Sequence, residues 1–413
     1  MLEAEKKLMK PYWKQNGNKI YQGDALEVLR TMPKESIHCV VTSPPYWGLR
    51  DYGIEGQLGL EKTPEEYIEK MVEIFREVKR VLRSDGSCWI NLGDSYAGSG
   101  SPGGDFRDGK GGDEYLRPYN RKGSGLKPKD LCGIPWRVAL ALQADGWFLR
   151  SAMPWVKRSA MPESVNDRPA SALEYMFLLT KSQKYYFDMD AIRKKQSDEW
   201  IERTKRDVNR PPPRLGGEER KGEILSKQYK ASPSGCNFRN TDLFFESLEP
   251  PFGAIFADDE LVGLDINPKG FPGAHFATFP PRLPEVAILA GTSEKGCCAE
   301  CGSPWERVVE KNSAIPARHG DWKATGETHR NDIDRKGGFY DATSKTTGWK
   351  PTCKCNADKK PCIVCDIFGG AMTSAIVAHK HNRKFIMIEL SKPYIDEIGI
   401  PRIEKETNQL KLW

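Results

Sequence analysis

The residues Ile37-His38-Cys39-Val40-Val41 form a nearly all-apolar run, which Thr42-Ser43-Pro44-Pro45-Tyr46-Trp47 follow directly. A continuous apolar run of this length is typical of a parallel strand that is covered on both faces. Upstream, residues 18–24 have the pattern of a strand, and residues 25–29 form a short amphipathic segment. The stretch therefore predicts a strand–helix–strand unit that ends in a loop stiffened by two prolines.

The same alternation continues downstream. Apolar residues recur at helical spacing between Pro64 and Arg83, and residues 88–92 form the next apolar strand. A helix is expected at residues 135–143, with strand-like runs at 147–157 and 175–187. Such alternation predicts an open parallel α/β sheet.

Length and composition limit the class of protein. The chain has 413 residues, of which 38% are hydrophobic and 29% charged, and this suits a catalytic core that carries insertions. No run approaches the roughly 18 apolar residues of a membrane span, and the charged first residues lack a signal core. These features predict a cytoplasmic protein without a membrane segment. The net charge of +6 permits a nucleic-acid partner without requiring one.

Two polar segments interrupt the core pattern. Residues 98–125 are rich in Gly, Asp, Lys and Arg, and they predict a mobile loop that is either a solvated insertion or a DNA contact. Residues 193–268 begin with a stretch dense in Lys and Arg that has no hydrophobic period. We expect this second segment to be a recognition region, with a solvated insertion as the alternative.

A cofactor half-site is indicated near the end of the chain. Residues 362–366 form a short apolar strand, a glycine-containing turn follows, and a helix opens at Thr373. A second strand, 384–389, ends in Glu389, roughly 20 positions after the turn, where a carboxylate can accept hydrogen bonds from ribose hydroxyls. The pattern predicts a nucleoside-type cofactor. This turn lacks the three-glycine spacing of a dinucleotide binder, and a Walker loop is absent too.

The Pro-Pro loop suits methyl transfer to an exocyclic amine of a base. Such a nitrogen is a poor nucleophile because its lone pair is delocalised into the ring. Ser43 and the Pro44 carbonyl can accept hydrogen bonds from its two N–H groups, and paired prolines hold these acceptors in place. Tyr46 offers a flat face on which an extruded base can stack. No covalent nucleophile is needed, and a turn without a catalytic role is the alternative interpretation.

Together these motifs resemble the β group of DNA amino-methyltransferases, and the similarity covers nearly the whole chain. The catalytic motif of that family is matched by Ser43 to Tyr46. Further matches are Gly23-Asp24-Ala25 near the cofactor adenine; Met161-Pro162-Glu163-Ser164, Asp167-Arg168-Pro169, Glu174-Tyr175 and Tyr185-Tyr186-Phe187-Asp188 around the target base; His275 to Pro280 over the methionine part of the cofactor; and Asp366 to Thr373 as the glycine motif.

The resemblance implies a Rossmann-like sheet that binds S-adenosylmethionine, with a circularly permuted motif order. The expected regions are 18–192 (catalytic half), 193–268 (target recognition), 269–295 (return to the core), 296–356 (cysteine-knuckle insertion) and 361–398 (cofactor half). The expected cofactor-binding residues are Asp24, Thr42, His275, Phe276, Ala277, Asp366, Phe368, Gly369, Gly370, Thr373 and Glu389, and the expected catalytic residues are Ser43, Pro44, Pro45 and Tyr46.

Two positions depart from the family pattern. Met372 stands where a glycine is usual and is expected to crowd the backbone near the cofactor carboxylate. Ser159 stands where relatives often have Asn. Serine before Pro-Pro resembles cytosine-N4 enzymes, which favours cytosine, with adenine N6 as the alternative. Carbon-5 methylation would need a Pro-Cys pair in the catalytic loop, and Pro361-Cys362 instead precedes the cofactor strand.

The cysteines suggest a metal site. The chain has 11 of them, and Cys298-x2-Cys301 with Cys353-x-Cys355 has the form of two chelating knuckles. We expect these four to hold a structural zinc ion, with Cys297 as a substitute ligand and unliganded thiols as the alternative. Cys362 and Cys365 are expected to belong to the core.

The resemblance implies double-stranded DNA as the substrate, with the target base flipped out of the helix. It leaves open a homodimer and a cognate restriction endonuclease. Two other functions stay under consideration: a DNA-binding homologue with weak or lost methyl transfer, and a methyltransferase that acts on RNA or a protein amide.

Overall fold

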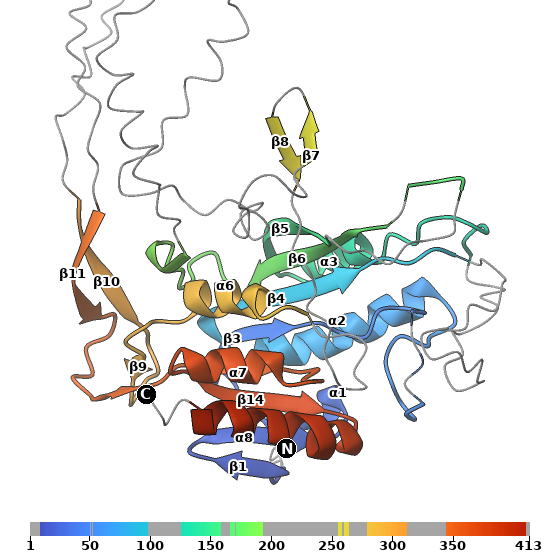
Figure 1. The fold of residues 1–413 in the computed structure, drawn as a ribbon. Coiled ribbons are helices and arrows are strands. Elements are labelled where there is room, and N and C mark those ends of the chain that lie inside the picture. The colour runs from blue at the N-terminus through green and yellow to red at the C-terminus, as the bar shows by residue number, and fades with distance from the viewer. Residues whose placement is uncertain are drawn as a thin grey trace, which may run out of the picture. The chain divides into compact units, whose positions relative to one another are not determined.

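An eight-stranded sheet organises the computed structural model of this chain (Figure 1). The structure describes residues 9–49, 51, 53–97, 125–157, 166–169, 171–192, 255–257, 260–263, 279–311 and 344–409. The chain divides into two compact units. The first comprises residues 1–188, 239–305 and 351–413, and the second comprises residues 189–238 and 306–350.

The sheet belongs to the first unit, and its central strands are parallel. In spatial order the strands are β1 (Trp13–Gln15), β2 (Asn18–Gln22), β14 (Lys384–Glu389), β13 (Ile363–Asp366), β3 (Ile37–Thr42), β4 (Leu82–Gly93), β6 (Leu173–Thr180) and β5 (Phe148–Val156). The five strands from β2 to β4 run parallel to one another. The two strands from the end of the chain, β14 and β13, therefore lie side by side between β2 and β3.

The edges of the sheet correct the expectation of a purely parallel arrangement. β1 pairs with β2, β6 with β4 and β5 with β6, and all three pairs are antiparallel. Antiparallel neighbours need no crossover helix, and among the described residues between β5 and β6 there is none. The runs predicted at 147–157 and 175–187 do contain strands. β6 ends at Thr180 and runs opposite to the central strands, whereas β5, antiparallel to β6, runs in the same direction as they do.

Helices cover both faces of the sheet (Figure 1). On one face α1 (Ala25–Thr31) packs against α2 (Pro64–Val81), which packs against α3 (Ile134–Ala144). On the other face α6 (Arg282–Gly291) packs against α7 (Thr373–Lys380), which packs against α8 (Ile400–Gln409). A π-helical turn, η6 (Tyr394–Gly399), leads into α8. The result is a three-layer α/β arrangement.

Local sequence explains where the helices begin. Thr63 caps α2 by accepting a hydrogen bond from the backbone N–H of Glu66, and Pro64 occupies the first turn. Asp24 caps α1 in the same way through Glu27 N–H. In α2 the apolar stripe that the sequence predicts is buried against the sheet, and all six residues of β3 are buried as well.

Three small sheets lie outside the central one. In the first unit, β9 (Cys297–Cys298) pairs with β12 (Lys359–Lys360), and β7 (Ile255–Ala257) pairs with β8 (Glu260–Gly263). The second unit contains the short η3 helix (Asp190–Ile192) and most of the pair β10 (Trp305–Lys311) and β11 (Ser344–Pro351). None of the helices in the described ranges has the length and apolar character that crossing a membrane would require.

Several predictions concern residues that the structure does not describe. The predicted recognition region is described only at β7 and β8. Outside the described residues lie 98–124 of the predicted loop, Ser159, Met161-Pro162-Glu163-Ser164, and the cofactor candidates His275, Phe276 and Ala277.

Candidate active site

A cavity of about 300 Å³ opens at the carboxyl ends of the central strands. The chain leaves β3 toward α2 on one face of the sheet and leaves β13 toward α7 on the other face. Divergence of this kind leaves a crevice between adjacent strands, where α/β proteins bind ligands. Residues from both ends of the chain line the cavity, among them Asp24, Ser43, Pro45, Phe279, Phe368, Gly369, Gly370, Thr373, Glu389 and Tyr394.

The glycine turn after β13 forms one wall of the cavity. Gly369 N–H donates to the Ile388 carbonyl at 2.8 Å, so the turn is tied to the neighbouring strand β14. Gly370 has a φ of +47°, a conformation that favours glycine. Thr373 begins α7 and accepts a 2.9 Å hydrogen bond from Arg402 of α8. The turn is therefore held from two sides, with its backbone exposed to the cavity.

Glu389 lines the cavity at the end of β14, where its carbonyl accepts a 3.0 Å hydrogen bond from Gly23 N–H, next to the cap of α1. Its two oxygens accept hydrogen bonds from Gly370 N–H and Ser391 N–H, both at 2.8 Å. Burial raises the pKa of this carboxyl, and the backbone donors oppose that effect. Each carboxylate oxygen can accept a further hydrogen bond, so the group stays available to a hydroxyl in the cavity.

Asp366 and Thr42 lie behind the wall, which changes their predicted role. Neither lines the cavity. Instead Asp366 accepts hydrogen bonds from Thr42 Oγ1 at 2.7 Å, from Ser374 Oγ at 2.6 Å and from Phe368 N–H at 3.1 Å. Burial raises its pKa to about 7, against the lowering effect of these three donors. The carboxyl joins the end of β3 to the glycine turn and so positions both walls.

Met372 does not itself line the cavity, although the sequence led us to expect it to crowd the backbone there. The residue has a φ of +59°, which explains why glycine would suit this position. Its side chain is fully buried and packs close to Gly369 of the turn and to Gly399 of η6. A Cβ atom placed on Gly399 would lie 2.8 Å from Met372 Cγ. The non-glycine residue is therefore accommodated by packing against a glycine in another element.

The Pro-Pro loop brings Ser43 and Pro45 into the cavity. Tyr67 of α2 donates a 3.0 Å hydrogen bond to the Pro45 carbonyl. Trp47 is buried and donates from Nε1 to the Glu61 carbonyl at 2.9 Å. Gly59 approaches the loop so closely that a Cβ there would lie 2.9 Å from the Tyr46 carbonyl oxygen. The loop is thus held firmly beside the cofactor wall.

Beneath the loop is a polar cluster that the sequence did not predict as a unit. Tyr46 Oη donates to Glu174 Oε2 at 2.6 Å, and Asn91 Nδ2 lies 2.7 Å from both of these oxygens. Ser43 Oγ is 3.4 Å from Tyr46 Oη. Lys157 pairs with the other oxygen of Glu174. Glu174 belongs to a motif quoted above, whereas nothing in the sequence singles out Asn91 or Lys157.

Other wall residues also escaped sequence reasoning. Phe279 falls in the stretch that resembles a cofactor motif, so a signal was present. Tyr394 begins η6, five residues beyond the predicted strand, and Ile54, Leu58 and Ile74 add apolar surface from elements without a recognisable motif. Apolar and aromatic residues of this kind suit a planar ring.

The four predicted knuckle cysteines come together near the amino ends of the central strands, away from the cavity. The sulfur atoms of Cys298, Cys301, Cys353 and Cys355 all lie within 4.8 Å of one another. Four thiolates at tetrahedral Zn–S distances would be roughly 3.8 Å apart, so the set fits a closed zinc site. Within this cluster a hydrogen bond with Ser303 is the main cause that lowers the pKa of Cys301 to about 6, whereas the neighbouring sulfurs of Cys301 and Cys353 raise the pKa of Cys355 to about 12.

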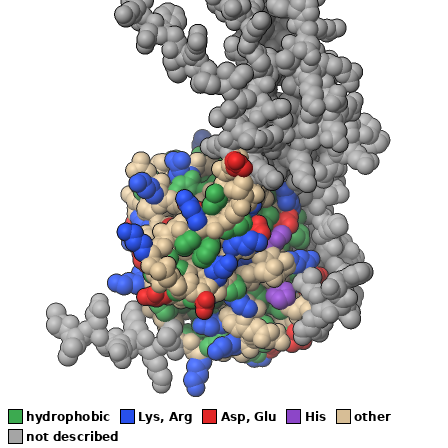
Figure 2. Space-filling model, turned by 90° about the vertical axis from the view of Figure 1, so that its left-hand side faces the viewer, with side chains coloured by type: hydrophobic (Ala, Val, Ile, Leu, Met, Phe, Trp, Pro, Cys, Tyr) green, Lys and Arg blue, Asp and Glu red, His purple; other side chains and the backbone are tan. Residues whose placement is uncertain are grey.

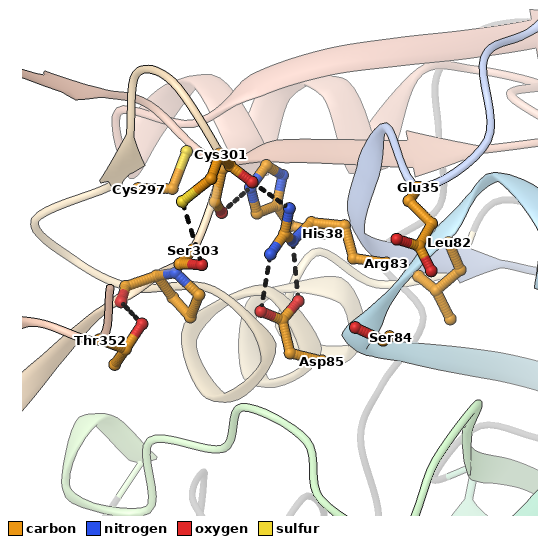
Figure 3. Close-up of polar contacts among 12 residues, drawn as sticks. Glu35, His38, Leu82, Arg83, Ser84, Asp85, Cys297, Cys301, Ser303 and Thr352 are labelled. Atoms are coloured by element: carbon orange, nitrogen blue, oxygen red, sulfur yellow. Dashed lines mark hydrogen bonds and ion pairs between the residues drawn. The ribbon is translucent and has the colours of Figure 1, made fainter. Parts of the chain in front are cut away.

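Side chains from the amino ends of β3 and β4 hold this knuckle in place (Figure 3). Arg83 donates from Nη1 to the Cys301 carbonyl at 2.8 Å and binds both oxygens of Asp85. His38 Nε2 lies 3.0 Å from the Gly302 carbonyl oxygen, and its Nδ1 accepts from Ile363 N–H. The four cysteines therefore lie at the end of these strands away from the cavity.

Cys297 belongs to a different group from the one expected for a substitute ligand. Its sulfur lies within 4.8 Å of the ligand atoms of His38 and Cys362, not among the four knuckle sulfurs. Both ring nitrogens of His38 are engaged by backbone groups. Cys362 and Cys365 are buried, as expected for core residues.

Figure 2 looks onto the amino-end edge of the sheet, where Lys and Arg side chains are interspersed with apolar and neutral ones. Around this edge several cations are already paired with carboxylates, since Arg76 contacts Asp145 at 2.6 Å and Lys181 contacts Glu35 at 3.0 Å. Much of their charge is therefore balanced within the protein.

Comparison with known proteins identifies close relatives. The family model described as DNA methylase matches residues 37–299. The Type II methyltransferase M.Cfr9I of Citrobacter freundii is 42% identical over 67% of this chain and 73% of its own length. The Type II methyltransferase M.SmaI of Serratia marcescens is 38% identical over 67% of this chain and 76% of its own. A solved structure described as PvuII DNA methyltransferase (cytosine-N4-specific) aligns over 97% of this chain and 94% of its own, at 18% identity and a TM-score of 0.45.

Proposed function

Because this chain belongs to the DNA methylase family, we propose that it transfers a methyl group from S-adenosylmethionine to an exocyclic amine of a flipped base in double-stranded DNA. The observation that carries the proposal is the shared cavity: Ser43 of the Pro-Pro loop and Glu389 of the cofactor half line the same space. A nucleoside bound against Glu389 would thus lie beside a group able to orient an amine.

S-adenosylmethionine supplies an activated methyl group when it is bound. Glu389 would accept hydrogen bonds from its ribose hydroxyls, and the apolar and aromatic wall residues Leu26, Ile74 and Phe368 would hold its flat ring. The backbone of the glycine turn and the amino end of α7 would bind its carboxylate. Asp366 and Thr42 keep the two walls in register without touching the ligand.

The reaction depends on orientation of the target amine. Ser43 Oγ and the Pro44 carbonyl accept hydrogen bonds from the two N–H groups, so that the nitrogen lone pair points at the methyl group. A bond forms between nitrogen and carbon as the carbon–sulfur bond breaks, and the nitrogen then loses one proton to solvent. Tyr46 stacks on the flipped base.

Cytosine N4 is the favoured target, and this preference rests on Ser43. Serine before the two prolines resembles the cytosine-N4 enzymes, whereas Asp or Asn at that position would resemble the adenine-N6 enzymes. Adenine N6 is the alternative target. A binding protein with weak or lost activity has less support, because Met372, which motivated it, is buried and does not line the cavity.

The motif order and the partners complete the proposal. The catalytic loop precedes the glycine turn in the chain while their strands, β3 and β13, are neighbours, which is the order of a circularly permuted family member. Residues 193–268 recognise the DNA sequence, with their many basic residues neutralising phosphates. The relatives are named Type II methyltransferases; we extend to this chain a cognate restriction endonuclease and a cytoplasmic location, and leave a homodimer open.

The knuckle holds a structural zinc ion in this proposal. Cys298, Cys301, Cys353 and Cys355 supply four sulfur ligands, and the contacts of Arg83 and His38 dock the site on the sheet. The test is the zinc content of purified protein, which should be about one ion per chain. A content near zero in protein purified without chelator would remove this part of the proposal.

Two single substitutions test the catalytic loop. Ser43→Ala and Tyr46→Ala should each lower methyl transfer at least about 100-fold, because one removes an acceptor and the other the stacking face. Both should bind S-adenosylmethionine almost as well as the unaltered protein, measured by calorimetry. Near-normal activity in both variants would contradict the mechanism.

The substrate is tested separately with labelled S-adenosylmethionine. Transfer is measured side by side to DNA, RNA and protein, and the modified DNA is digested to nucleosides. We expect N4-methylcytosine in DNA. N6-methyladenine would select the alternative target, and transfer only to RNA or protein would overturn the proposed function.

A further inference from the structure

The polar cluster beneath the Pro-Pro loop joins three strands to the reacting residue Ser43. Asn91 lies on β4, Glu174 on β6 and Lys157 just after β5. The side chain of Glu174 is only 8% exposed, and Asn91 is 2% exposed. Such a buried carboxylate needs several donors, and it has them in Tyr46, Asn91 and Lys157.

The chemistry of these groups fixes which way each hydrogen points. An ionised carboxylate only accepts, so Tyr46 must direct its single hydroxyl hydrogen at Glu174 Oε2. The Asn91 nitrogen, not its oxygen, must face the same carboxylate, and it also donates to Tyr46 Oη at 2.7 Å. Tyr46 Oη has then no hydrogen left for its contact with Ser43.

The consequence falls on Ser43. In the 3.4 Å contact between Ser43 Oγ and Tyr46 Oη, the serine hydroxyl has to be the donor. Its hydrogen therefore points under the loop. Asn91 Nδ2 also lies 3.5 Å from Ser43 Oγ, so one lone pair of Oγ can accept from below and the other is left for the cavity that Ser43 lines. This is the orientation that an acceptor for an amine N–H requires.

We propose that Glu174 is a positioning residue for methyl transfer: it fixes the Tyr46 hydroxyl so that Ser43 presents a lone pair, not a hydrogen, to the target amine. The inference rests on the proposed function. Lys157 binds Oε1 of Glu174 and leaves Oε2 to Tyr46 and Asn91. Tyr46 thus has two tasks, a stacking face above and a hydrogen-bond relay below.

Glu174→Gln is the sharpest change, since it keeps the shape of the side chain. An amide can turn its N–H₂ toward Tyr46. The tyrosine hydrogen is then free to point at Ser43, so the direction of the hydrogen bond between Tyr46 and Ser43 is reversed. Tyr46→Phe keeps the stacking ring and removes the relay. We expect either change to lower kcat about 10- to 100-fold, with the DNA KM and the dissociation constant of S-adenosylmethionine unchanged within about threefold.

A double-mutant cycle separates this role from a merely structural one. With Tyr46→Phe already present, Glu174→Gln has no hydroxyl to redirect and should cost less than about threefold in kcat. Glu285→Gln is the matched control. The Glu285 carboxylate is also paired, with Arg282 on α6 and with His381 at the end of α7, and it does not line the cavity. It should leave kcat unchanged.

The outcomes are distinct. Equal loss from Glu174→Gln in both backgrounds would overturn the proposal. So would full activity of Tyr46→Phe, a conservative change that decides the matter even if Glu174→Gln fails to fold. Absence of any transfer to DNA by the unaltered protein would instead overturn the proposed function itself.

Discussion

Met372 is a buried residue in a conformation that favours glycine. A non-glycine residue at a φ of +59° carries a cost of roughly 1–2 kcal/mol. Its fully buried side chain, packed against η6, offsets that cost because removing a buried methionine typically loses about 2–5 kcal/mol. The balance makes methionine the better residue here, whatever its relatives have.

Met372→Gly should therefore destabilise the protein and leave the cofactor site unchanged. We expect the free energy of unfolding to fall by about 1–3 kcal/mol, since the lost packing exceeds the relieved backbone strain. Chemical denaturation measures this change, and calorimetry with S-adenosylmethionine measures affinity. Met372→Leu, which keeps most of the volume, serves as the control. A tenfold gain in cofactor affinity for the glycine variant would mean that Met372 crowds the ligand after all.

At the residue scale, the sequence predicted those cavity residues that belong to a recognisable motif. Asp24, Ser43 and Glu389 all line the cavity because each sits at a strand end or helix cap that the pattern locates. Asn91 and Lys157 could not be found in this way. Their role comes from contacts with a loop far away in the chain, and only the pairing of β4, β5 and β6 brings them together.

At the scale of the elements, the two ends of the central strands carry different sites. The carboxyl ends of β3, β13 and β14 form the cavity, and the amino ends of β3 and β4 carry the cysteine knuckle. Apolar runs and helical spacing predicted β3 and α2 well, because both bury regular faces. The reversed direction of β6 was not predicted, since strand pairing leaves no periodic trace in the sequence.

This division predicts that metal and cofactor bind independently. Cys353→Ser should reduce zinc from about one ion per chain to near zero and lower the melting temperature, because four thiolates are needed to close the site. S-adenosylmethionine affinity should stay within about threefold, since distant sites without shared partners behave independently. Zinc content and calorimetry on the same sample check both.

Cys132→Ala is the control for that experiment. Cys132 is buried but lies outside both groups of cysteines, so its zinc content should be unchanged. Loss of cofactor binding in the zinc-free Cys353→Ser variant would show that the cysteine knuckle and the cavity are coupled through the sheet, contrary to this expectation.

On the scale of the whole molecule, the sheet is assembled from both ends of the chain. The match to the family model ends at residue 299, yet β13 and β14 lie beyond it and fill the middle of the sheet between β2 and β3. Val364, Phe385 and Met387 on these strands are fully buried. The matched segment thus carries the catalytic loop without the strands that complete its fold.

A chain that ends at residue 311 should therefore neither fold cooperatively nor bind S-adenosylmethionine. Without β13 and β14, β2 loses its parallel partner and β3 loses one of two, so apolar strand surface and backbone groups become exposed. Thermal unfolding followed by circular dichroism, together with calorimetry, measures both properties. Co-expression with the fragment 344–413 should restore them, because that fragment supplies the missing strands. The truncation also removes Cys353 and Cys355, and the full-length Cys353→Ser variant shows how much of the loss comes from the metal site alone. If the truncated chain melted cooperatively and bound the cofactor by itself, the two central strands could not be what holds the cavity together.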